Sequence, residues 1–191
     1  MKTCKGAADP ALAARAKDGD EQAFAELVRR HKAPLYRLLR RYVGDPDEAY
    51  DVAQEAFISA WGAIGRFDPD RPFLAWLRTI AINKARDYGR RAAFRRLILG
   101  DESLGARAQA KPDPGMAADE GLIEQQRITA LDEAIVRLPR PLKEALLLTA
   151  FEGLSHQEAG AVLGISVKAV ETRVYRARKM LARTLDPELK P

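Results

Sequence analysis

The sequence predicts an all-α protein of two small helical domains joined by a flexible linker, the C-terminal one containing a helix-turn-helix. Three observations lead to this prediction. Apolar residues recur at helical spacing along most of the chain, whereas strand-like alternation is nearly absent. The periodicity fails between residues 97 and 121, where four glycines and two prolines gather. Near the C-terminus, two capped helices follow one another and the second is basic.

The first predicted domain, residues 9–96, begins with Asp9 as a helix cap followed by a proline at the first helical position. Asp20 is expected to cap a second helix, which Pro34 kinks. His31 falls in the apolar stripe of that helix, and no companion metal ligands lie near it in the sequence. We expect a partly buried histidine that is hydrogen-bonded within the fold.

A Gly44-Asp45-Pro46 break is expected to cap a third helix, which has a regular apolar face. The opposite face is acidic and also carries a large branched apolar residue. It consists of Asp51, Gln54, Glu55 and Ile58. The pattern fits a docking face for a basic protein partner, and it also fits a solvated acidic face. A carboxylate metal site is less favoured, because one helix face cannot surround a cation.

The stretch from residue 66 to residue 96 combines a turn-rich loop, aromatic residues and a basic helix end. Bases stack on aromatic rings, amides read base edges and guanidinium groups hold phosphates, so this combination suits single-stranded nucleic acid. The polar face of the helix carries Asn83, Arg86 and Arg90. We expect Trp76 to be at least half in the core and Phe67 to be the more exposed ring.

The predicted linker, residues 97–121, separates this domain from a second one at residues 122–185. Fully stretched, the linker reaches roughly 80 Å, and as a coil about 28 Å. The two domains could then bind DNA sites a couple of helical turns apart. The second domain is expected to begin with helices at 123–138 and 141–151.

The helix-turn-helix is predicted from a Ser155 to Glu158 capping box, a turn at Gly164 and a Ser166 cap on the second helix. Val170, Val174 and the residues that continue their stripe should be buried. The opposite, polar face is our candidate for reading duplex DNA in the major groove. It consists of Lys168, Glu171, Thr172, Arg173, Arg176 and Lys179. A basic face alone is most often just solvated, and the caps and turn favour the DNA reading.

Composition limits the choice of partner and compartment. The 191 residues carry a net charge of +5, which favours a polyanion. Charge is segregated, since residues 45–60 contain five acids and no base, whereas 84–96 contain six bases and one acid. Cys4 is the only cysteine, and we see neither an export signal nor a membrane span. We expect a cytoplasmic protein without membrane insertion.

In the order of these parts, the chain resembles a bacterial RNA polymerase sigma factor of the extracytoplasmic-function group. DVAQEAFISAW (51–61) looks like the polymerase-docking helix of that family, and RFDPDRPFLAWLRTIAIN (66–83) like its segment that captures flipped bases. KARDYGRRAAFRR (84–96) resembles the helix end that meets upstream duplex. The most specific match is to the domain that reads the minus-thirty-five element, which residues 138–181 resemble, with the sequence LPRPLKEALLLTAFEGLSHQEAGAVLGISVKAVETRVYRARKML.

The resemblance implies roles for individual residues and partners. Core polymerase would dock on the acidic face of the third helix. The minus-ten element would meet Phe67, Asp68, Arg71, Trp76, Asn83, Arg86, Arg90 and Arg91. Glu171 stands where many members carry a basic residue, and would accept a hydrogen bond from cytosine instead of donating to guanine. Inhibition by a separate anti-sigma protein is implied, and no cofactor is.

Two other functions are alternatives for a chain with these parts. An ordinary helix-turn-helix repressor or activator would use the first domain for dimerisation or ligand binding, and would not need the acidic docking face or the aromatic and basic stretch. An enzyme acting on nucleic acid would need a P-loop or a carboxylate cluster for magnesium, and neither is visible. We therefore expect a non-catalytic specificity subunit.

Overall fold

The computed structural model describes residues 8–69, 71–99 and 119–185, and every regular element within these ranges is helical. This confirms the predicted all-α class. Cys4 and residues 100–118 of the predicted linker lie outside the described residues. The flanking helices are longer than predicted, since one continues to Leu99 and the next begins at Asp119. The first and last three residues of the predicted linker are therefore helical.

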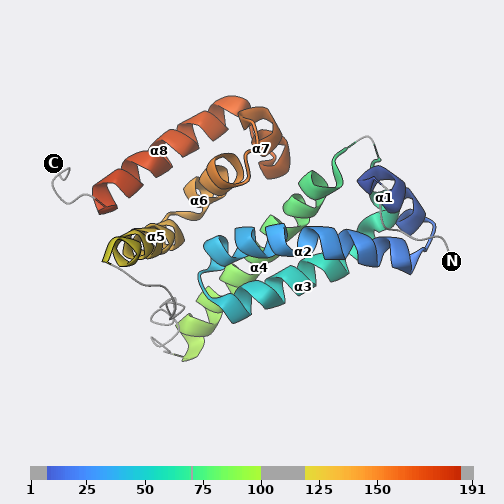
Figure 1. Ribbon diagram of the computed structural model, residues 1–191, viewed down its shortest axis with the longest axis horizontal. Coiled ribbons are helices and arrows are strands. Elements are labelled where there is room, and N and C mark those ends of the chain that lie inside the picture. Colours follow the sequence, from blue (N-terminus) through green and yellow to red (C-terminus); the bar gives the residue numbers. More distant parts are fainter. Residues whose placement is uncertain (1–7, 70, 100–118, 186–191) are drawn as a thin grey trace.

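The N-terminal half is a helical bundle. Figure 1 shows α2 and α3 side by side, α4 crossing them and α1 at one end. The elements are α1 (Asp9–Lys17), α2 (Glu21–Val43), α3 (Pro46–Ala63), the short 3-10 turn η1 (Ile64–Arg66) and α4 (Phe73–Leu99). Helix α2 is continuous through Pro34. Alanines at four positions of the buried α3 stripe, Ala49, Ala53, Ala56 and Ala60, let α2 approach closely.

Two of the three predicted helix caps in this half are confirmed. The Asp20 side chain accepts a hydrogen bond from the Ala23 N–H at 3.0 Å, and the Asp45 side chain accepts two at the start of α3. The prediction for Asp9 is wrong, because Ala8 is the N-cap of α1 and makes no side-chain bond. Asp9 lies one residue inside the helix, where its carboxylate turns towards α2.

The Asp9 carboxylate ties α1 to α2. It accepts a hydrogen bond from His31 Nε2 at 2.7 Å and another from Arg30 at 3.1 Å. His31 is 8% exposed, which confirms the prediction of a hydrogen-bonded histidine within the fold. The glutamate nearby, Glu26, accepts from Arg29 and Arg30, and these bonds lower the pKa of its carboxyl to about 2. Together these contacts fix α1 against α2.

The C-terminal half contains the predicted helix-turn-helix. Its elements are α5 (Asp119–Arg137), α6 (Arg140–Leu146), the π-helical turn η3 (Leu147–Phe151), α7 (His156–Leu163) and α8 (Val167–Leu185). The helix expected over 141–151 therefore ends in a π-helical turn. Helix α8 packs against α5, α6 and α7. The predicted stripe of α8 is confirmed, since Val170, Val174, Ala177 and Leu181 are buried.

The turn between α7 and α8 follows the predicted pattern. Ser155 and Glu158 form a complete capping box, and Gly164 has a left-handed backbone with φ of 68°. The Ser166 side chain accepts from the Ala169 N–H at 3.2 Å and caps α8. A Cβ atom on Gly160 would lie 2.8 Å from the Ile165 carbonyl oxygen, so the turn requires glycine there. The backbone of this turn fixes the orientation of α8 relative to α7.

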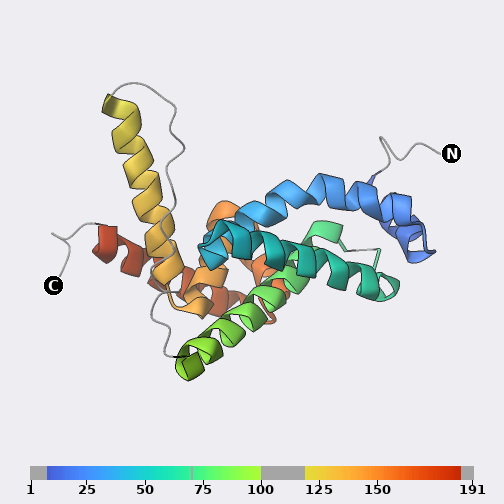
Figure 2. The same ribbon diagram turned by 90° about the horizontal axis from the view of Figure 1, so that it is seen from below.

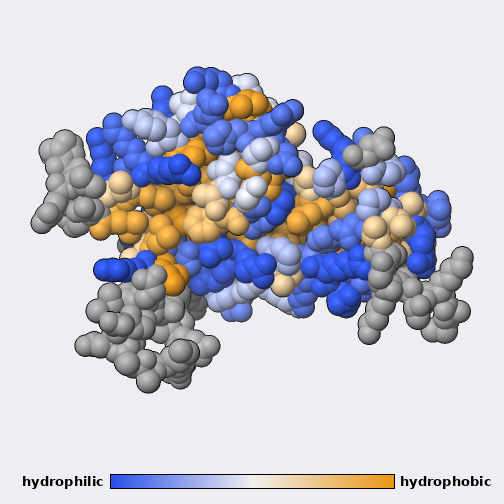
Figure 3. Space-filling view, turned by 45° about the horizontal axis from the view of Figure 1, so that its top comes forward, coloured by the Kyte–Doolittle hydropathy of each residue, from blue (hydrophilic) through white to orange (hydrophobic). Residues whose placement is uncertain are grey.

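The two halves pack against each other. Helix α2 contacts α5 and η3, and α4 contacts α7. Figure 2 shows the same arrangement from below, with the C-terminal half beside the N-terminal half. Gly44, at the end of α2, approaches the Val136 side chain so closely that a Cβ atom would lie 3.0 Å from it. Figure 3 shows a band of apolar residues between polar regions on one face of the molecule. The described halves therefore form a closed arrangement.

Candidate nucleic-acid and protein-docking surfaces

The predicted docking face lies on α3 and is accessible. Ile58 is 71% exposed, and Asp51 and Gln54 are exposed beside it. Glu55 is partly exposed and accepts a hydrogen bond from Arg91 of α4 at 3.2 Å. An isoleucine of this exposure, surrounded by carboxylates, offers a partner both apolar area and negative charge.

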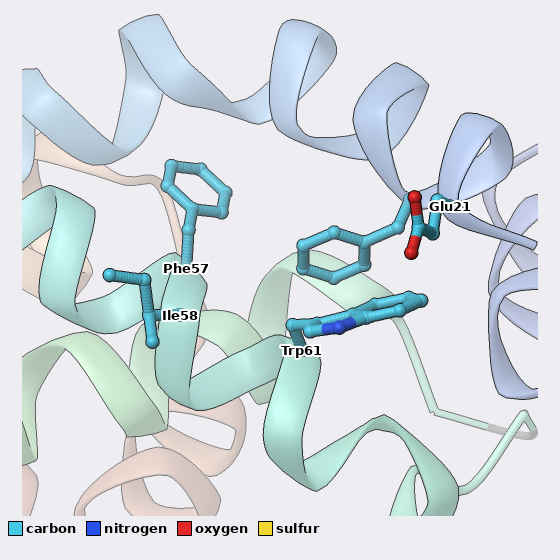
Figure 4. A pocket seen from close by; sticks show the side chains of 5 residues that line it. Glu21, Phe57, Ile58 and Trp61 are labelled. Carbon is cyan, nitrogen blue, oxygen red and sulfur yellow. The ribbon is translucent and has the colours of Figure 1, made fainter. Parts of the chain in front are cut away.

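Two apolar hollows lie between α2 and α3, one on each side of Ile58. The first is lined by Glu21, Phe24, Phe57, Ile58 and Trp61. Figure 4 shows Phe57, Ile58 and Trp61 projecting from α3, with Glu21 facing them from α2. The second is lined by Val28, Lys32, Tyr36, Tyr50, Ala53, Gln54, Phe57 and Ile58. The sequence reasoning missed these hollows, because helical periodicity places Phe57 and Trp61 on the apolar face of the third helix without indicating open space beside them.

The ring of Phe67 is buried, and the expectation that it is the more exposed ring is wrong. Phe67 is 2% exposed, with its ring centroid 5.6 Å from that of Phe73 and 5.1 Å from that of Trp76. Its N–H donates to the Ile64 carbonyl and its carbonyl accepts from Lys17 Nζ at 3.3 Å, which fixes the backbone with the ring inward. Trp76 is partly buried, as expected. We call Phe67, Phe73 and Trp76 the ring cluster.

The loop that follows the ring cluster is exposed. Asp68 and Arg71 are at the surface, and the Arg71 N–H donates to the Asp68 carbonyl at 3.1 Å to form a turn. Pro72 comes directly before α4, and its carbonyl accepts from the Trp76 N–H at 3.3 Å. Asn83 is also exposed, further along α4. The polar side chains expected to meet DNA are therefore accessible.

The three arginines expected to contact phosphates are all paired with carboxylates. Arg90 bonds Asp87 on its own helix, and Arg91 bonds Glu55. Arg86 Nη2 donates to Glu144 of α6 at 2.6 Å, and its Nη1 donates to Asn83 at 3.2 Å. The bond to Glu144 raises the pKa of the Arg86 guanidinium. Arg86 is thus the one of the three that contacts the other half of the chain.

Glu144 lies at the centre of a polar group that we call the interface cluster, in which Tyr42, Lys143 and Glu144 are buried and Arg86 is partly buried. Glu144 is 2% exposed and accepts from the Tyr42 hydroxyl at 2.9 Å and from Arg86 Nε at 2.8 Å. Lys143 Nζ donates to the carbonyls of Tyr42 and Val136 at 3.1 and 2.6 Å. Burial lowers the pKa of Lys143 to about 8 and, with Glu144, raises the pKa of the Tyr42 hydroxyl.

Two further charged contacts join the halves. Arg78 of α4 bonds Glu152, and both side chains are about nine-tenths buried, at 11% and 10% exposed. Arg41 of α2 donates to Asp132 at 3.2 Å and lies over the Phe151 ring, 4.6 Å from its centroid. The sequence reasoning missed all of these contacts. The only local signal was the charged pair at residues 143–144 within an apolar run.

The candidate recognition face of α8 points to solvent. Lys168, Arg176 and Lys179 are exposed, and Glu171, Thr172 and Arg173 are partly buried. Lys168 donates to Glu171 at 3.2 Å, and the Thr172 hydroxyl donates to the Lys168 carbonyl at 2.9 Å. Tyr175, which the sequence reasoning did not select, is 67% exposed between these side chains. Helix α8 therefore presents donors, one acceptor and an aromatic ring on one side.

Within the described ranges, three or more His, Cys, Asp or Glu residues do not come together in a way that could hold a metal ion. No described helix is long and apolar enough to cross a membrane.

Comparison with known proteins gives a match for each half. Residues 27–95 match the model for Sigma-70 region 2, and residues 128–181 match the model for Sigma-70, region 4. RNA polymerase sigma factor CnrH of Cupriavidus metallidurans is 43% identical over 186 residues, which cover 95% of this chain and 96% of that protein. ECF RNA polymerase sigma factor SigW of Bacillus subtilis is 34% identical over 173 residues, covering 88% and 92%.

A solved structure extends the likeness to three dimensions. The structure of CnrH in complex with the cytosolic domain of CnrY matches with a TM-score of 0.68 at 36% identity, covering 95% of this chain and 99% of that one. The likeness therefore spans both halves.

Proposed function

The chain belongs to the extracytoplasmic-function group of the sigma-70 family of RNA polymerase sigma factors, and on this premise we propose which of its surfaces perform each step of initiation. It is a specificity subunit that binds core RNA polymerase and directs promoter recognition and opening. The N-terminal half, residues 9–96, docks on polymerase and opens the minus-ten element. The C-terminal half, residues 122–185, reads the minus-thirty-five element.

Core polymerase docks on Asp51, Gln54, Glu55 and Ile58. The observation that carries this assignment is the exposure of Ile58 between two apolar hollows. An apolar projection beside a hollow is the geometry of an interface anchor, and the carboxylates around it favour a basic partner surface. The neighbouring Trp61 and Tyr50 line the hollows and would contact apolar side chains of the partner.

The minus-ten element is captured by the exposed loop and by α4. Asp68, Arg71 and Asn83 supply hydrogen bonds to unpaired bases, and the arginines of α4 hold phosphates. Phe67 does not stack on a base, because it is buried, and it acts by holding the loop in place. Trp76, which is partly exposed, retains a face that a base could reach.

Polymerase is required energetically. Opening about ten base pairs costs on the order of 14 kcal/mol, whereas stacking two or three captured bases returns about 2 to 9 kcal/mol. The chain by itself therefore cannot hold a bubble, and we propose that it is non-catalytic and acts in the cytoplasm with polymerase. A separate anti-sigma protein is its proposed inhibitor, supported by the solved structure of the related CnrH with a bound domain of CnrY.

The minus-thirty-five element is read by Lys168, Glu171, Thr172, Arg173, Arg176 and Lys179 of α8. The solvent-facing side chains of this helix support the assignment. Glu171 would favour cytosine through its amino group.

The test is binding of the purified protein to core RNA polymerase, followed by transcription from a library of promoter fragments. Ile58→Ala should weaken binding to core polymerase about tenfold, the loss typical of an interface anchor. Ile128→Ala is the matched control, because it removes the same atoms from an exposed isoleucine of α5. Equal affinities of the two variants would refute Ile58 as the anchor. Absence of polymerase binding by the unaltered chain would refute the assignment of the docking function itself.

A further inference from the structure

The burial of α6 and of the turn after it indicates a specific interface between the two halves of the chain. Residues 143–148 are all buried, although α6 and the turn after it need only one face to pack against α8. The second face is covered by the N-terminal half, which supplies Tyr42 and Arg86. The close approach of Gly44 to Val136 completes the fit. A helical segment with burial all round indicates a specific second interface.

The charged side chains of this interface allow the two halves to separate, because water can replace the hydrogen bonds between them. A buried carboxylate is tolerated only when donors satisfy it, and Tyr42 and Arg86 of the N-terminal half donate to Glu144. If the halves separate, Glu144, Lys143 and Arg86 can each be hydrated. Interfaces of this kind within one chain allow the parts to move relative to each other. Both a closed and an open arrangement are therefore physically accessible.

The interface occupies a side chain that DNA binding needs. The Arg86 guanidinium presents its Nε and Nη2 donors to the Glu144 carboxylate at 2.8 and 2.6 Å. A phosphate is recognised by the same fork of donors. One guanidinium cannot satisfy both partners with the same hydrogens. The Glu144 carboxylate is thus placed where a DNA phosphate would bind Arg86.

The closed arrangement also limits reach. Two elements centred near positions ten and thirty-five are separated by about 25 base pairs, or about 85 Å. Helices α4 and α8, of 27 and 19 residues, are about 40 and 28 Å long. The eight-residue helix α7 contacts both of them. The combined length of α4, α7 and α8 is less than the separation of the two DNA elements. The two halves of the chain must therefore move apart to bind both DNA elements at once.

We propose that the interface cluster is an intramolecular latch. In the free chain Glu144 holds Arg86 and keeps the halves closed, and DNA phosphate replaces Glu144 when the halves separate. The Arg78 to Glu152 pair strengthens the closed form. This inference rests on the proposed function in two assignments, that of Arg86 to a DNA phosphate and that of the two halves to the two promoter elements.

The closure is tested first, without DNA or polymerase. A Cys4→Ser chain with Ala14→Cys in α1 and Ala161→Cys in α7 is labelled with an energy-transfer pair at these two exposed sites. Glu144→Gln should shift the equilibrium about tenfold or more towards the open form, the usual loss for a hydrogen bond to a charged group, and lower the transfer efficiency. Glu133→Gln is the matched control, since it changes the net charge equally but breaks only a pair within α5.

The release of Arg86 is tested second, by binding to a labelled 30-base-pair duplex of random sequence without polymerase. Glu144→Gln should bind about tenfold more tightly than Glu133→Gln. If Glu144→Gln does not fold, as judged by circular dichroism, Glu152→Gln serves for both measurements.

The outcomes separate the latch from the proposed function. Equal transfer efficiency in the unaltered chain, Glu144→Gln and Glu133→Gln would overturn the latch. Opening without a gain in DNA affinity would overturn the competition for Arg86. Failure of the unaltered chain to bind core polymerase would instead overturn the proposed function and leave the transfer result standing.

Discussion

Replacing Phe67 with alanine tests whether its ring holds the fold or captures a base. The ring is 2% exposed and contacts the rings of Phe73 and Trp76. Burying a phenyl side chain stabilises a fold by about 1.5 to 3 kcal/mol. Each aromatic pair adds about 0.5 to 1.5 kcal/mol. We expect Phe67→Ala to lower the free energy of unfolding by about 3 to 5 kcal/mol, the usual cost of this change in a core.

The assay is thermal unfolding followed by circular dichroism. For a helical half of this size, 1 kcal/mol shifts Tm by about 4 to 8 °C, so the first transition should fall by more than about 10 °C. Phe94→Ala is the control, because the same substitution at a ring that is 63% exposed should change stability by less than about 0.5 kcal/mol. Equal Tm values for the two variants, with promoter opening lost only in Phe67→Ala, would refute the buried role.

Three further predictions concern the turn, the interface and the recognition helix. Gly160→Ala should destabilise the protein by about 1 to 3 kcal/mol in urea unfolding, because the added Cβ would collide with the Ile165 carbonyl oxygen. Gly62→Ala is the control and should stabilise the protein by about 0.5 to 1 kcal/mol, because a Cβ at Gly62 would meet no neighbouring atom. The pKa of Lys143 is about 8 in the folded chain and 10.5 in the unfolded chain, so the unfolded chain binds more protons between these two pH values. The free energy of unfolding, compared with that of Lys143→Met, should therefore rise as the pH increases from 8 to 9.5. Arg173→Ala should cost about 1 to 3 kcal/mol at particular base pairs in binding to duplex variants, and a uniform loss would mean that it contacts phosphate.

The helices were predictable because their signals are local. The Ser155 to Glu158 capping box, the Asp20 and Asp45 caps and the stripe of α8 each depend on residues within a few positions of one another. Such local signals do not depend on the tertiary contacts of the helix. Asp9 is the exception, because a tertiary partner, His31, competes for its carboxylate and wins over the cap.

The exposed part of the site was also predictable. Ile58 and Asn83 lie opposite the apolar stripes of their helices, so helical periodicity alone places them at the surface. Phe67 lies in a loop, where no periodicity applies, and its burial depends on rings supplied by α4. Glu144 meets Tyr42 across 102 positions of sequence, and no local pattern specifies such a pair.

The exposed face around Ile58 has a consequence for the solubility of the free chain. Two copies that met through this isoleucine would bring the carboxylates of Asp51 and Glu55 against those of the other copy. Like charges in such contact repel, which disfavours self-association. A basic surface meets the opposite situation and is attracted. The carboxylates therefore select for a positively charged partner surface. They allow Ile58 to remain exposed to solvent without promoting self-association of the chain.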